Sequence, residues 1–354
     1  MHSIIGIIAK YYAFLSAWAI FGVTSLYFYF FGKERAAEKK SILGLISFAF
    51  PWKEWKSGSS RIDIFVFVAE KFFGAFHLAV SVALPTFIAV WLSSQVDFSW
   101  VPHLQSSIWA MAVVGVVLLI LMDFADYVSH FLQHFVPFLW EIHKMHHAAT
   151  YLTPITARRV HLAGEMFEEL LVTLLIVVPL AIFRVMFHLS IPDMLALMGL
   201  ANGLSAILVL DSLRHSHLPV SFGRFDAVLM SPHMHQLHHS SKIAHWDKNF
   251  GHRFSVWDWW FGTMLVPIKG ESFPWGLGKS EQEEYNTMFG AYILPFVKMA
   301  KLVGGKPLPD YKGGLVAQDP SFFRRVLWRS PSDIYAKQRM LNLLPNGAEY
   351  GAAE

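Results

Sequence analysis

Long runs of apolar residues divide the first part of the chain into segments long enough to cross a membrane. A transmembrane helix needs about 20 consecutive, mostly apolar residues, because each residue advances the helix by about 1.5 Å. Such runs recur along the first 210 residues, separated by polar connectors. The pattern predicts an all-α integral membrane protein with about four to five transmembrane or re-entrant helices. The expected spans are roughly 11–31, 74–92, 108–124, 168–187 and 194–210.

The distribution of basic residues predicts the side of the membrane that each connector occupies. The connector after the first span is rich in Lys and Arg, whereas SSQVDFSWVPHLQSS, between the second and third spans, contains neither. By the positive-inside rule, the first connector is expected in the cytoplasm and the second outside. The third span then returns to the cytoplasm. The last two apolar runs, joined by a turn around Ser190 to Pro192, are expected to form a hairpin that returns to the same side.

Composition agrees with a membrane protein and limits the chemistry that the chain can carry. Hydrophobic residues make up 54% of the chain and charged residues 16%, and the mean hydropathy is +0.40. The formal charge of +3 is too small, and basic tracts too scarce, to indicate a nucleic-acid partner. The chain has no cysteine, which excludes a disulfide framework, an iron–sulfur cluster and a thiolate-ligated haem. Any transition metal must therefore be bound through nitrogen and oxygen.

Histidines are concentrated in one part of the sequence. Of the 18 histidines, His2, His77 and His103 precede His130, and the other fifteen lie between His130 and His252. Residues three and four apart share a face of a helix, so the H-x-x-x-H and H-x-x-H-H spacings predict rings that point the same way. Neutral imidazoles around a metal explain such clustering, whereas charged rings would repel one another. The two blocks, expected to form the two halves of one site, contain His130, His134, His143, His146 and His147, and then His235, His238 and His239.

The number of histidines favours two metal ions. A zinc ion takes four ligands, or three with a water, so eight or more histidines are too many for one zinc. Carboxylate di-iron proteins use Glu-x-x-His pairs, which these blocks lack. A bis-histidine haem would place its ligands inside facing spans. A histidine-rich di-iron centre under a cytoplasmic helical cap is the better interpretation. The alternative is a non-enzymatic metal-binding or metal-transporting membrane protein, which would need more polar residues within its spans.

The ordered set of motifs resembles the fatty acid hydroxylase/sterol desaturase superfamily of membrane di-iron enzymes. The resemblance covers roughly 123–264 and rests on HFLQH, HKMHH, RHSHLP, SPHMHQLHH and DKNFG followed by SVWDWWFGT. The last two motifs look most like the alkylglycerol monooxygenase branch, although bacterial sterol-desaturase-like proteins share them. The resemblance implies three regions: an N-terminal transmembrane region (1–122), a catalytic domain (123–264) and a C-terminal cytoplasmic tail (265–354).

In such families the matching histidines bind two iron ions, which activate O2 to hydroxylate or desaturate a lipid. His215, in RHSH, matches a family histidine and is added to the predicted ligands. His161, in ARRVH, matches another, but Leu162 stands where relatives often have proline, so a supporting role is equally consistent with the motif. The metal ligands implied by the resemblance are His130, His134, His143, His146, His147, His161, His215, His235, His238 and His239, and no catalytic residue is predicted beyond them.

Polar residues near the histidines are predicted to orient them. Ligating histidines usually donate their second N–H to a carboxylate or a carbonyl group. Asp126 precedes His130 by one helical turn, and Asp247 and Asn249 lie in the family's D-x-N element. These three residues are expected to orient or supplement the ligands. His252 is expected in an outer or surface position, and the aromatic run from Trp257 to Phe261 is expected to anchor the chain at the membrane interface.

The predicted reaction needs two electrons for each O2, and the sequence contains no module that would collect them. It has no cysteine, no His-Pro-Gly-Gly haem motif and no Gly-x-Gly-x-x-Gly fingerprint. An external donor is therefore expected, either a ferredoxin or cytochrome b5-like carrier or, in some branches, a pterin. Lys144, Arg158 and Arg159 lie close to the histidines, where they are expected either to steer an acidic carrier or to contact anionic lipid headgroups.

Overall fold

The computed structural model of the protein describes residues 2–32, 40–268, 270–277 and 282–303. Within these ranges the ordered elements are helices, and the only strand-like pairings are two isolated bridges, Leu229 with Phe254 and Ser240 with Trp275. The predicted all-α class is confirmed. Most of the predicted tail, from residue 304 onward, and residues 33–39 of the basic connector lie outside the described residues.

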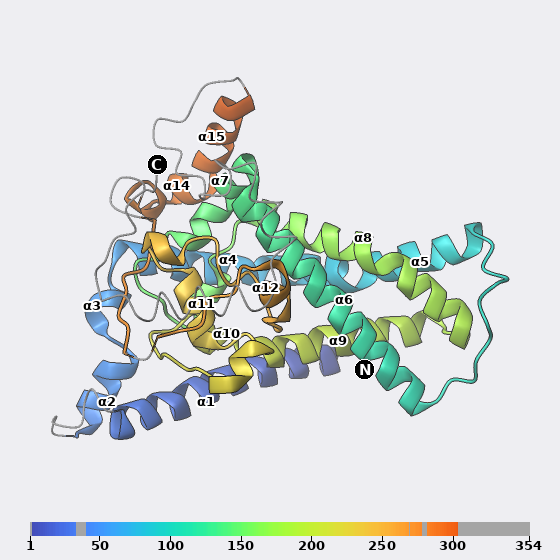
Figure 1. Ribbon diagram of the computed structural model, residues 1–354, viewed down its shortest axis with the longest axis horizontal. Helices are drawn as coiled ribbons and strands as arrows, with labels where there is room; N and C mark the ends of the chain where they lie inside the picture. The colour runs from blue at the N-terminus through green and yellow to red at the C-terminus, as the bar shows by residue number, and fades with distance from the viewer. Residues whose placement is uncertain (1, 33–39, 269, 278–281, 304–354) are drawn as a thin grey trace.

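Three helices in the described ranges are long and apolar enough to cross a membrane: Phe76–Gln95, Ile108–Phe135 and Leu162–Phe187. The segment Phe76–Gln95 is the second part of a longer continuous helix. In it, α4 (Gly58–Leu78) continues through a π-helical turn, Ala79–Ala83, into α5 (Leu84–Gln95). The other two are α6 and α8. Helix α9 (Ile191–Val209) packs beside them, and buried side chains from α5, α6, α8 and α9 form the largest apolar core. Figure 1 shows these helices together on one side of the molecule.

The predicted hairpin between the last two apolar runs is present. Helix α8 ends at Phe187, and the next residue, His188, caps it in a left-handed conformation with φ 52°. Ser190 then caps α9: its side chain accepts from the Asp193 backbone N–H, and the Asp193 carboxylate accepts from the Ser190 N–H. Pro192 occupies the first turn, where its missing N–H costs nothing. This reciprocal cap explains why so short a turn reverses the chain.

The N-terminal helix α1 (His2–Phe31) lies along one edge of the molecule against α2 (Ile42–Ala49) and α10 (Asp211–Arg214). Its segment Leu15–Phe31 is a shorter apolar helix. Two buried residues, Phe21 and Leu213, belong to a small core between these elements. The N-terminal region is thereby attached to the part of the chain that carries the histidines (Figure 1).

Short helices gather at the opposite end from the α8–α9 turn and form a cap (Figure 1). Helix α6 ends at Phe135 and α7 (Pro137–His147) follows at once, with Pro137 in its first turn, where a proline lacks no needed N–H. Ser231 caps α11 by accepting from the Met234 N–H, with Pro232 in the first turn. The cap also contains α3 (Trp52–Trp55), α12 (Val256–Phe261), α14 (Met288–Tyr292) and α15 (Leu294–Val303).

A buried arginine ties the loop after α7 to α4 and to the C-terminal part of the cap. Arg159 is fully buried and donates to Asp63 at 3.0 Å, to Met145 O at 2.8 Å and to Tyr285 O at 3.2 Å. Lys144 is also buried, at 1% exposure, and bonds to Glu141 at 2.7 Å. The expectation that Lys144 and Arg159 meet a carrier or lipid headgroups at the surface is therefore wrong, because neither side chain reaches it.

Candidate metal centre

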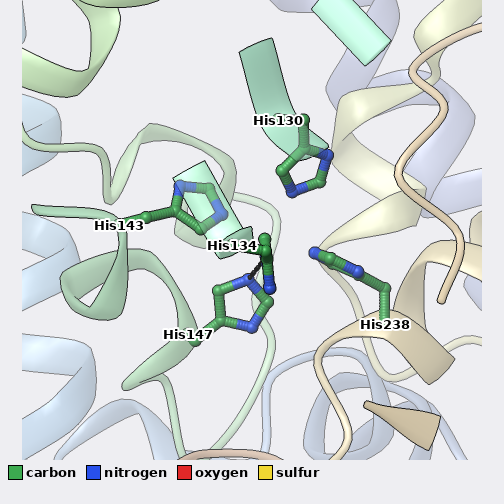
Figure 2. A group of neighbouring side chains, drawn as sticks. All are labelled: His130, His134, His143, His147 and His238. Carbon is green, nitrogen blue, oxygen red and sulfur yellow. Dashed lines mark hydrogen bonds between the residues drawn. The ribbon is translucent and has the colours of Figure 1, made fainter. Parts of the chain in front are cut away.

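Nine buried histidines form two adjacent groups where the end of α6 meets the cap. Within each group, one nitrogen from each ring lies within 4.8 Å of the others. None of the nine residues is more than 7% exposed. Figure 2 shows the first group, whose rings come from α6, α7 and α11 and turn their nitrogens toward a common centre. The first group is His130, His134, His143, His147 and His238, and the second is His146, His215, His235 and His239.

Each group draws on both sequence blocks. In α7, His143 and His147 are four residues apart and face the first group, while His146 faces the second. Adjacent helical residues point about 100° apart, so His146 and His147 necessarily diverge. The expectations that the three rings of α7 share one face, and that each block forms one half of the site, are therefore wrong. Helix α11 divides in the same way, with His238 in the first group and His235 and His239 in the second.

Several ring nitrogens in the groups approach one another at hydrogen-bonding distance (Figure 2). His134 Nε2 and His147 Nε2 are 3.0 Å apart, and His215 Nε2 lies 3.0 Å from His235 Nε2. Two nitrogens bound to one metal ion at about 2.1 Å in a tetrahedral site are separated by about 3.4 Å. The observed spacings are close to this value. Among the described residues, His130 Nε2, His238 Nε2 and both nitrogens of His143 are buried without a hydrogen-bond partner. Buried polar atoms rarely remain unpaired, so these nitrogens fit a metal ion in the first group. In the second group the Nε2 atoms of all four histidines converge, a donor set that also fits a metal ion.

Backbone carbonyl groups hold the other ring nitrogen of three of these histidines. His130 Nδ1 lies 2.8 Å from Phe250 O, and His238 Nδ1 lies 2.7 Å from Lys248 O. His146 Nδ1 lies 3.2 Å from Arg159 O. A carbonyl only accepts, so each Nδ1 carries the proton and each Nε2 presents a lone pair to the group. His235 differs, because Arg214 donates to its Nδ1 at 2.7 Å. Its neutral ring therefore carries the proton on Nε2, which faces the second group, and a metal ion bound there would displace that proton.

Burial keeps the histidines of the cap neutral. Desolvation lowers the pKa of His146 to about 4 and lowers the pKa of His143 well below its ordinary value. A neutral imidazole is the form that binds a metal ion, so the electrostatics of the site are those a metal centre requires. Desolvation also lowers the pKa of four other ligands in the cap, with repulsion from neighbouring rings or Arg214 as a further cause: His147, His235, His238 and His239.

Comparison with known proteins now assigns the chain to a family. Residues 115–263 match the family model described as fatty acid hydroxylase. The chain is also 27% identical over 243 residues to the ornithine lipid hydroxylase OlsE of Rhizobium tropici, a match that covers 67% of this chain and 68% of that protein. These similarities support a place for residues 115–263 in the fatty acid hydroxylase superfamily. The resemblance inferred from the motifs is confirmed, and the family and the three apolar helices together make this a membrane protein.

Two more distant relatives are alkylglycerol monooxygenases. The protein from Danio rerio is 24% identical over 185 residues, and the one from Caenorhabditis elegans is 25% identical over 208 residues. These matches cover 52% and 56% of this chain but only 36% and 37% of the relatives. No solved structure matches the chain.

His161, the tenth predicted ligand, lies outside both groups of histidines. His161 caps α8: its Nδ1 accepts from the Ala163 N–H at 3.1 Å, while its Nε2 lies 3.2 Å from Tyr292 O. Both ring nitrogens are thus occupied by the backbone. In this structure His161 joins α8 to α14, which agrees with the supporting role that the motif also allowed.

The predicted orienting residues have different surroundings. Asp247 lies 3.8 Å from His134 Nδ1, which is close enough for an electrostatic contact. The Asn249 side chain instead joins two backbone segments. It donates to Met234 O and Leu265 O, both at 2.8 Å, and accepts from the Leu265 N–H at 2.7 Å. Asp126 bonds to Arg253 rather than to a histidine of either group.

A third polar cluster adjoins the first group. Asp126, Glu168 and His252 lie within 4.8 Å of one another, and the ring of His252 is 5.6 Å from that of His130. Arg253, bonded to Asp126, already supplies a cation here, so we do not assign a metal to this cluster. The side chain of His252 is 24% exposed, which partly agrees with its expected outer position.

Sequence reasoning missed two charged residues that support the site, Arg253 and Asp258. Arg253 donates to Asp123 at 3.2 Å, linking the loop before α12 to α6. Asp258 is fully buried and accepts three hydrogen bonds, described below. The sequence did contain a sign of Asp258, because it is the one charged residue in the aromatic run WDWWF. A charged side chain in such a run is rarely buried without a role. Trp257, expected as a membrane anchor, instead donates to Asp123 at 2.7 Å.

Proposed function

We propose that the protein is a membrane di-iron oxygenase that uses O2 to hydroxylate a lipid. The observation that carries this proposal is the pair of adjacent, buried, all-histidine groups, five rings beside four, with unpaired nitrogens turned inward. Each group has enough nitrogen donors for one transition-metal ion. The family match and the relatives named as lipid hydroxylase and monooxygenase support an oxidoreductase rather than a metal transporter.

The proposed reaction is RH + O2 + 2e⁻ + 2H⁺ → ROH + H2O. Bound iron would supply the redox chemistry that inserts one oxygen atom into a C–H bond, and the protein's task is to hold and shield it. The carbonyl groups of Phe250, Lys248 and Arg159 keep three rings in one tautomer. Complete burial of the nine histidines limits the access of water, which would otherwise intercept a reactive oxidant.

The arrangement also suggests how a lipid reaches the first group. Helices α6 and α8 expose large apolar side chains along their length, including Val116, Leu170 and Leu174. At the cap end of these helices, His252 is partly exposed and contacts the ring of His130. We place the approach of the substrate on this side, between α6 and α8. Hydroxylation is favoured over desaturation because the relatives are named hydroxylase and monooxygenase.

The electrons come from an external donor, a ferredoxin, a cytochrome b5-like carrier or a pterin, and we propose that the site faces the cytoplasm. Of the three basic residues predicted near the histidines, only Arg158 has an exposed side chain, at 48%, and it pairs with Glu70 at 3.3 Å. Steering by these residues is therefore weaker than the sequence indicated.

The test is reconstitution of the purified full-length protein with iron, an ornithine lipid, isotopically labelled O2 and a chemical reductant. We expect about two iron ions per chain, on the ligand count above, and a lipid product that contains one labelled oxygen atom. An alkylglycerol and a sterol serve as alternative substrates in parallel reactions. The proposal would be refuted by a single bound zinc ion, or by a product whose new oxygen atom is unlabelled and therefore comes from water.

A further inference from the structure

One short backbone segment, residues 248–252, contacts the histidines of both metal groups. Lys248 O holds His238 Nδ1 at 2.7 Å and Phe250 O holds His130 Nδ1 at 2.8 Å, both in the first group. His252 O accepts from Arg214 at 3.0 Å, and Arg214 also donates to His235 Nδ1, in the second group, at 2.7 Å. The carbonyl groups of Lys248 and Phe250 therefore bond to the first group directly, and that of His252 is linked to the second group only through Arg214.

The segment holds a conformation that needs external support. Asp247 and Asn249 have φ values of 55° and 59°, in the left-handed region that L-residues rarely adopt. Gly251 has no space for a side chain, because a Cβ atom there would lie 2.4 Å from Phe254 O. Residues held in sparsely populated conformations persist only where surrounding contacts fix them.

Asp258 supplies such contacts from the far side of the segment. Its Oδ1 accepts from the Phe250 N–H and its Oδ2 from the Gly251 N–H, both at 2.8 Å, and Thr263 Oγ1 donates to Oδ1 at 2.7 Å. The Gly251 N–H and the Phe250 carbonyl belong to one peptide plane, in which they point in opposite directions. Because the carboxylate fixes the N–H, it also aims the carbonyl at His130.

We propose that Asp258 is a positioning residue for both metal groups. Its carboxylate orients residues 248–252, and these align His130 and His238 directly and His235 through Arg214. The proposal rests on the proposed function only in that both groups bind a metal. The Asp258→Asn substitution preserves the size of the side chain but replaces one acceptor oxygen with an NH2 donor. That donor would face the N–H of Phe250 or of Gly251, and because two donors cannot bond, the peptide plane must rotate.

The experiment titrates the purified, metal-free full chain with cobalt(II) under anaerobic conditions and records visible spectra. The wild-type protein is expected to bind two ions with two ligand-field components, because a four-nitrogen and a five-nitrogen site absorb differently. Asp258→Asn should weaken both components about ten- to one-hundred-fold, the usual effect of losing a ligand's orienting partner. Arg214→Lys should change only the four-nitrogen component, because Arg214 bonds to His235 and to no histidine of the first group. The control is Asp226→Asn, at another buried carboxylate, which accepts from the Phe222 N–H at 2.8 Å, and it should change neither.

The outcomes separate the two proposals. Wild-type binding of fewer than two ions counts against the proposed function. Two ions bound equally well by wild type and Asp258→Asn overturn the positioning role, as does equal loss in Asp226→Asn, which would indicate general destabilisation. If Asp258→Asn does not fold, Thr263→Val removes one hydrogen bond to the carboxylate with little change in volume. It should weaken both components to a smaller extent, and wild-type affinity in this variant would also overturn the proposal.

Discussion

The two neighbouring arginines after α7 offer a direct test of how burial determines the value of an ion pair. Arg159 and Asp63 are both completely buried and 3.0 Å apart, whereas Arg158 and Glu70 are 3.3 Å apart with 48% and 15% of their side chains exposed. The perturbation is Asp63→Asn, which keeps the shape and one acceptor but removes the negative charge. The matched control is Glu70→Gln.

Asp63→Asn leaves a buried guanidinium without its counter-ion. Breaking a buried pair in this way costs about 3–5 kcal/mol. Backbone oxygens of Ser59, Met145 and Tyr285 still accept from Arg159, so we expect a loss near about 3 kcal/mol, the lower end of that range. Unfolding entropy is about 2.1 cal/mol/K per residue, so for 354 residues each kcal/mol corresponds to roughly 1.3 °C and the melting temperature should fall by about 4 °C. An exposed pair contributes about 0–1 kcal/mol, so Glu70→Gln should lower the melting temperature by less than about 1.5 °C.

The assay is thermal unfolding of the metal-loaded protein in detergent, followed by intrinsic fluorescence at one scan rate for all variants. Because Arg159 O holds His146, Asp63→Asn should also weaken metal binding in the second group, which metal analysis after mild chelation detects. A melting temperature within about 2 °C of wild type for Asp63→Asn would refute the reasoning from burial. Equal effects of the two substitutions would refute it as well.

Three further predictions follow from the site and the spans. His215→Ala should lose about one metal ion per chain by metal analysis, whereas His161→Ala should retain both, because only His215 belongs to a group. The metal-free protein should lose stability as the pH falls from about 6.5 towards about 4, because His146 binds a proton in the unfolded chain but stays neutral when it is buried in the folded one. Melting temperatures that do not change across this pH range would contradict the prediction. Gln95→Cys introduces the single cysteine of the chain, and it should react with a membrane-impermeant thiol reagent added outside the cell. A cysteine that does not react from outside would contradict the predicted orientation.

Local periodicity was sufficient to predict the membrane class and most of the ligands. The apolar run that predicted a span near residues 108–124 lies within α6, and the hydrophobic register of a helix depends only on residues near one another in sequence. The spacing of His130 and His134, and of His143 and His147, placed each pair on one face for the same reason. The motifs also identified the family, because their order along the chain is a property of the sequence alone.

The division of the histidines into two groups was decided by tertiary structure. Helical spacing says which rings share a face, but the partner of each face depends on how α6, α7 and α11 pack, and this placed His146 with His215 rather than with His147. Burial also depends on packing, which is why Arg159 became a structural residue and not a docking residue. His161 is a helix cap because its nitrogens meet the backbone of α8 and Tyr292, 131 residues away. The sequence by itself determined which chemical groups the protein has, and only the fold decided which of them meet, because contacts between distant segments depend on the packing of the whole chain.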